Sequence, residues 1–180
     1  MLGLLRKGGL LAACALAIPG TAFAATQGTL GATSTGSVSI GATIPARAQI
    51  SGLTDVAFGT VDPSVAASSA ENVCVWSNTS GKGYQVTATG SGASSAFTLS
   101  NGTGTLAYSV EWAGSSGQSS GTALTSGTAL SGLASTATSP TCGSGPAATA
   151  SLVVKMTAAN LQAAVASTYN GTLTLVVAPQ

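Results

Sequence analysis

The side chains best suited to catalysis in this 180-residue chain are its four carboxylates, of which Asp55 and Asp62 lie seven positions apart around an apolar stretch. A glycosidase needs two facing carboxylates about 5–10 Å apart, and the sequence alone leaves that arrangement open. The neighbouring Thr54 and Pro63 favour turns instead, and we interpret both aspartates as turn residues. The chain contains no His, which excludes Ser-His-Asp triads and His-ligated metals, and its Ser and Thr hydroxyls lack a base. We therefore expect no enzymatic activity, no cofactor and no metal site.

Two tryptophans are the other residues whose side chains could form a functional site, in this case a binding site. Trp76 and Trp112 could form a platform on which sugar rings stack, which would make the chain a secreted carbohydrate- or surface-binding module. Tryptophan within an alternating strand more commonly belongs to the core. The sequence leaves this binding module as an alternative function.

Charged residues make up 5% of the chain, against roughly 25% in a typical soluble domain. The five Lys and Arg residues are too few to neutralise a row of phosphates, so we expect no nucleic-acid partner. Small and β-branched residues dominate instead, and they favour an all-β extracellular protein.

The first 24 residues have the pattern of a signal peptide. Arg6 and Lys7 precede an apolar run over residues 10–18, and Ala22-Phe23-Ala24 provides small residues before the expected cleavage site. A lipoprotein signal with Cys14 as the lipidated residue is the alternative. Cleavage after residue 24 leaves Cys74 and Cys142, which we expect to form one disulfide in an exported chain, two free buried thiols being the other possibility.

Short alternating segments follow the expected cleavage site. Val38, Ile40, Ala42 and Ile44 alternate with small polar residues, which is the period of a strand. Further strands are expected over residues 49–53, 56–60, 72–77, 84–89, 96–100, 106–112, 151–156 and 171–178, with weak strands around 124–133 and a short helix over 157–164. This spacing predicts a β-sandwich or barrel, preceded by a flexible leader and strand over residues 25–45. The 38–44 segment could be the first strand of its own sandwich or a strand given to a neighbouring copy.

Several stretches of the mature chain resemble the spore coat protein U family, the pilin domain of archaic, Csu-type chaperone–usher pili. The similar stretches are residues 36–44, Phe58-Gly59-Thr60, the Cys-bearing residues 72–76 with 84–87, and the closing residues 169–177. The resemblance covers nearly all of residues 36–178. One departure is the absence of Cys from residues 46–49, where family members commonly carry one bonded to the strand of Cys74.

The resemblance implies an immunoglobulin-like β-sandwich over residues 46–180 that lacks its last strand. A periplasmic chaperone would fill the resulting groove first, and the next subunit's N-terminal segment would replace it at an outer-membrane usher. Such a chain would be a structural subunit of a pilus or surface coat that supports adhesion and biofilm, passing through the periplasm to the cell surface, with no small-molecule substrate. The donor residues would be Val38, Ile40, Ala42 and Ile44, and the acceptor groove would present Leu173, Leu175 and Val177.

Overall fold

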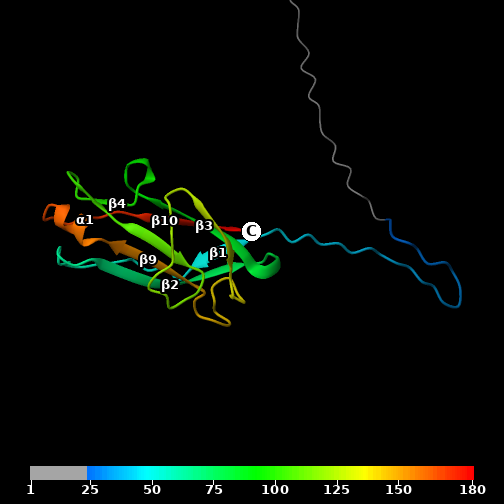
Figure 1. Cartoon of the computed structure of the whole chain (residues 1–180). Helices are drawn as coiled ribbons and strands as arrows, with labels where there is room; N and C mark the ends of the chain where they lie inside the picture. Colours follow the sequence, from blue (N-terminus) through cyan, green and yellow to red (C-terminus); the bar gives the residue numbers. More distant parts are fainter. Residues whose placement is uncertain (1–23) are drawn as a thin grey trace, which may run out of the picture. The chain divides into compact units, whose positions relative to one another are not determined.

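A computed structural model describes residues 24–180, so the expected signal peptide, except for its last residue, lies outside the described residues. The chain divides at Ile44 into an N-terminal segment and a compact unit, Pro45–Gln180 (Figure 1). Within the N-terminal segment, the backbones of Thr26 and Ser37 exchange two hydrogen bonds of 2.9 Å. Residues 38–44 form no strand. The alternation in this segment is therefore not matched by a ladder of backbone hydrogen bonds.

The compact unit contains one larger antiparallel sheet with the strand order β1-β2-β9-β6-β7. Its strands are β1 (Ala48–Ser51), β2 (Ala67–Ser77), β9 (Ala150–Met156), β6 (Ser109–Ala113) and β7 (Thr122–Ala123). β2 changes partner along its length: its first seven residues pair with β9, and its last four pair with β1. β1 therefore covers only one end of the β2 edge.

A second antiparallel sheet has the order β10-β3-β8, with β10 (Leu173–Pro179), β3 (Gly83–Gly90) and β8 (Ala129–Ala134). A small hairpin adds β4 (Thr98–Ser100) and β5 (Thr105–Ala107), and two 3-10 turns cover Ser80–Lys82 and Ala93–Ser95. Helix α1 (Ala158–Ala163) lies at the end of the unit opposite the C-terminus (Figure 1). Thr157 caps this helix by accepting a hydrogen bond from the Asn160 backbone N–H, as the expected helix over 157–164 requires.

The inner faces of the two sheets form the core. Alternate residues of β2 and β3 point inward, among them Val73, Val75, Tyr84 and Val86, which are fully buried. Trp112 joins them from β6, and its indole N–H donates to the Tyr84 hydroxyl at 3.1 Å. This packing of two antiparallel sheets confirms the all-β sandwich.

A disulfide joins Cys74 to Cys142, with Cα atoms 5.9 Å apart, as expected from the two cysteines of the mature chain. Cys74 is one residue out of phase with the core-facing Val73 and Val75, so it faces the other side of β2. There Cys74 and Cys142 pack with Ala137 and the half-buried Trp76 in a second small cluster. The low-complexity segment that contains Cys142 is thus fixed to the outer face of β2.

The strand expected over residues 56–60 is wrong, and the strand expected over residues 106–112 is divided at Tyr108 into β5 and β6, which belong to different sheets. Residues 56–60 lie in no strand, although Val56 and Phe58 are half-buried while their neighbours Ala57 and Gly59 are exposed. The sequence alternation describes which side chains face the core, but the segment forms no ladder of backbone hydrogen bonds with a strand.

Candidate functional site

The two strands that end the sheets on one side of the sandwich are β1 and β10. Within the described residues each has one strand partner: β1 pairs with β2, and β10 pairs with β3. Both strands reach the turn between β2 and β3, where Arg47 O accepts from Asn78 N at 3.1 Å and Gly83 O accepts from Gln180 N at 3.0 Å. At this end of the sandwich, Cα atoms of β1 approach those of β10 to within 8 Å.

The side of the sandwich opens beyond Gly52. This glycine has a φ of +76°, a conformation that other residues adopt only with strain, and it ends β1 after four residues. Residues 53–60 then continue past β2 without joining its ladder. One side-chain contact fixes them, because the Thr54 hydroxyl donates to the Glu71 carboxylate of β2.

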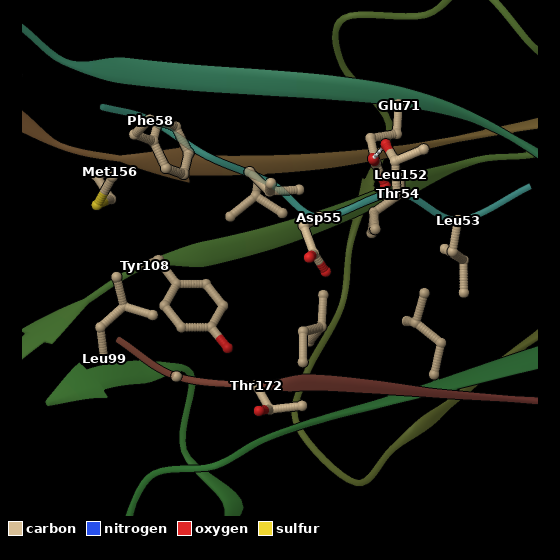
Figure 2. Close-up of a pocket in the computed structure, with 15 residues that line it drawn as sticks. Leu53, Thr54, Asp55, Phe58, Glu71, Leu99, Tyr108, Leu152, Met156 and Thr172 are labelled. Carbon is tan, nitrogen blue, oxygen red and sulfur yellow. Dashed lines mark hydrogen bonds between the residues drawn. The ribbon is translucent and has the colours of Figure 1, made fainter. Parts of the chain in front are cut away.

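A groove lies between residues 53–60 and the start of β10 (Figure 2). Its main cavity measures about 830 Å³. A second cavity of about 730 Å³ shares Val56, Phe58, Leu99, Met156 and Gly171 with the first and extends toward α1. Apolar side chains from the 53–60 segment, from β4, and from β9 and β10 of the two sheets line most of the main cavity: Leu53, Val56, Phe58, Leu99, Leu152, Val154, Met156, Leu173 and Leu175.

A few polar groups interrupt this apolar lining. The Asp55 side chain points from the 53–60 segment into the space between that segment and β10 (Figure 2). Tyr108 also lines the groove, and burial raises the pKa of its hydroxyl above the ordinary tyrosine value. Glu71 Oε2 is buried without a hydrogen-bond partner. Across residues 24–180, no group of three or more His, Cys, Asp or Glu side chains could hold a metal ion.

The groove has the two features by which proteins bind an extended peptide. The outer edge of β10 offers unpaired backbone groups, and the apolar lining offers places for alternate side chains. Of the expected acceptor residues, Leu173 and Leu175 line the groove. Val177 packs against the core farther along β10 and lines neither cavity.

Sequence reasoning did not assign the opposite wall and the floor of the groove. Val56 and Phe58 were expected in a strand but not at a site. Leu152 and Val154 come from β9 and Tyr108 from between β5 and β6, all distant in sequence from the expected acceptor residues. The alternation at 56–58 was the available signal for an inward-facing wall. The floor residues carry no comparable signal, because they are indistinguishable from other core residues.

The expected donor residues are all exposed. Val38, Ile40 and Ile44 are 72%, 92% and 82% exposed, and Ala42 is exposed as well. Large apolar side chains left in water at alternate positions favour burial against another surface. Among residues 24–44, the part of their segment that the structure describes, no surface covers these side chains.

The remaining candidate residues, Trp112 and Asp62, make contacts within the fold and do not line the groove. Trp112 is 1% exposed and its indole N–H donates to the Tyr84 hydroxyl, so it belongs to the core, as tryptophan in an alternating strand commonly does, and presents no face to a sugar ring. Asp62 Oδ1 accepts hydrogen bonds from the Ser64 hydroxyl at 2.7 Å and the Ser64 backbone N–H at 2.8 Å, which confirms its role in a turn. The bond from the Ser64 hydroxyl has the larger effect on the pKa of Asp62 and the bond from the backbone N–H the smaller, and both lower this pKa. Among the described residues, no helix is long and apolar enough to cross a membrane.

Comparison with known proteins leaves the family open. No protein-family model matches the chain, and no curated protein matches it at a significant level. Function must therefore be argued from the groove and from the exposed segment of the same chain.

Proposed function

We propose that the chain is a structural subunit of a pilus or surface coat and that it polymerises by donor-strand exchange. In this proposal, residues 38–44 of one copy insert beside β10 of the next copy. The carrying observation is that one chain contains both an open apolar groove beside an unpaired strand edge and an exposed alternating apolar segment. The groove offers a strand edge and an apolar surface, and the exposed segment offers a strand with apolar side chains that could cover them.

The dimensions of the two parts support the match. The donor residues 38–44 number seven, as do the residues of β10, Leu173–Pro179. An inserted strand at about 3.3 Å per residue would therefore follow β10 along its whole length. Two strands that flank a third lie roughly 9.5 Å apart, so β1 must move outward from β10 where their Cα atoms lie within 8 Å. Insertion can begin at the open half, beside residues 53–60.

The same features imply that the free subunit needs a partner. An unpaired edge next to exposed apolar side chains is a template for aggregation, and proteins normally cover such edges. A periplasmic chaperone that covers the groove before assembly, and an outer-membrane usher where exchange takes place, fit this requirement. In this proposal the sandwich is immunoglobulin-like without its last strand, as in archaic pilins, and the polymer serves adhesion and biofilm at the cell surface.

Gel electrophoresis of surface material from the native host tests the proposal. Strand-exchanged polymers dissociate slowly, so unboiled samples should give a ladder of multimers that collapses to one band after boiling. Deletion of residues 36–44 should abolish the ladder. Deletion of residues 27–35, which removes the same number of leader residues, should leave it intact. A single monomer band before and after boiling, or equal ladders from both deletions, would contradict the proposal.

A further inference from the structure

One residue, Asn78, is bonded through its side chain and its backbone to the first residues of the sandwich, where the donor segment ends. Its Nδ2 donates to Pro45 O at 2.9 Å, and its Oδ1 accepts from Arg47 N at 2.6 Å. The Asn78 backbone N–H also donates to Arg47 O at 3.1 Å. Three backbone groups within three consecutive residues, 45–47, are therefore bonded to a single residue that directly follows β2.

These bonds fix the direction of the chain. In an extended strand the backbone groups of residues i and i+2 point to the same side. Pro45 O, Arg47 N and Arg47 O all point toward Asn78, and β1 continues the ladder with Ala48 opposite Ser77. Residues 45–47 thus continue the extended backbone of β1.

If the donor segment filled the groove of its own chain, residues 45–47 would have to adopt a different conformation. Residues 38–44 would have to fold back along the free edge of β1, and a hairpin needs a reversal of about two to five residues, which would fall at 45–47. Proline is common in such turns, so Pro45 alone does not prevent the reversal. The bonds to Asn78 do, because a turn would redirect Pro45 O and Arg47 N away from β2.

We propose that Asn78 is a positioning residue that prevents the donor segment from filling its own groove and so keeps it for a second copy of the chain. This inference rests on the proposed function. Loss of the side chain removes two hydrogen bonds that only the extended conformation of residues 45–47 makes. The ratio of self-filled to open groove should then rise on the order of tenfold.

A labelled peptide with the sequence of residues 36–44 measures the open groove. It is titrated into the monomeric fraction of the mature chain and followed by fluorescence anisotropy. Because a self-filled groove does not bind peptide, N78A should bind more weakly than the unaltered chain, with a loss that reaches about tenfold when the self-filled form predominates in both chains. N78D, which keeps the acceptor oxygen, should lie between them and also serves if N78A does not fold.

Asn101 offers a matched control. Its Oδ1 accepts from the backbone N–H groups of Thr103 at 2.9 Å and Gly104 at 2.6 Å and from the Thr103 hydroxyl at 3.1 Å, so N101A removes three side-chain bonds, all of them away from the junction at residues 45–47. N101A should bind peptide like the unaltered chain. Deleting residues 36–44 from N78A should restore its binding, because the competing segment is then gone.

The outcomes separate the two proposals. Equal peptide affinity in the unaltered chain and N78A overturns the role of Asn78 and leaves donor-strand exchange standing. Failure of the deletion to restore binding also overturns it. If no variant, including those lacking residues 36–44, binds the peptide, then donor-strand exchange itself is overturned.

Discussion

Replacing Ile40 with Ala should weaken association between subunits without destabilising the subunit. Ile40 is 92% exposed in the chain, so its truncation there should cost less than about 0.5 kcal/mol. If Ile40 fills a neighbour's groove, the same truncation costs about 2–5 kcal/mol, the range for a buried Ile. The groove is open along one side, so the lower part of that range, about 2–3 kcal/mol, applies.

This difference corresponds to about 30- to 150-fold weaker association at 1.4 kcal/mol per factor of ten. Peptides of residues 36–44 with and without the I40A change, titrated against the monomeric chain, measure it directly. Thermal unfolding of I40A in the whole chain provides the stability measurement, which should not change.

Leu30 provides the control, because it is an equally exposed apolar residue of the leader, outside the donor segment. L30A should leave both assembly and thermal unfolding unchanged. Burial of Ile40 in a neighbour's groove would be refuted if the peptides with and without I40A differed in affinity by less than threefold. It would also be refuted if the I40A and L30A chains lost assembly equally.

Three further predictions concern the groove, the disulfide and an ion pair. L175D should abolish binding of the 36–44 peptide while the circular dichroism spectrum stays that of the native fold, because Leu175 is half-buried and lines the groove. Replacing both Cys74 and Cys142 by Ala should lower the free energy of unfolding by about 4 kcal/mol in guanidinium titrations, because their sequence separation is 68; a loss below about 1 kcal/mol would contradict this. Lys155 donates hydrogen bonds of 2.8 Å to both carboxylate oxygens of Glu111, and these bonds lower the pKa of Glu111. The ionised carboxylate therefore stabilises the fold above its unfolded-state pKa. This stabilisation is lost as the pH falls through the folded-state pKa. The melting temperature should accordingly fall less between pH 6 and about pH 3 in E111Q than in the unaltered chain, and identical profiles would contradict it.

The features predictable from the sequence were those that depend on local pattern. The helix followed from Thr157 as a cap before good helix formers, and the disulfide from two cysteines left in an exported chain. The inward direction of Leu173 and Leu175 followed from period-two alternation. Each of these requires little knowledge of which segments lie side by side.

The features that were missed depend on distant segments meeting. Residues 56–60 alternate like a strand, but β2 pairs with β1 only over its last four residues, and Gly52 directs the following chain away from the ladder. Trp112 is buried against Tyr84, a contact between two sheets that no local pattern marks. Asn78 looks like an ordinary turn residue, since its bonds to Pro45 and Arg47 span more than thirty positions.

Cross-linking between two copies tests donor-strand exchange most directly. One copy carries a single Cys at a donor position from 38 to 44, and the other carries L175C or L173C, each tagged so that the mixed dimer is distinguishable by size. Because alternate side chains of a strand face the same way, Cys at 38, 40, 42 or 44 should cross-link to the groove, and Cys at 39, 41 or 43 should not. Cross-linking without this alternation, or none between copies at any position, would contradict the insertion of this segment beside β10.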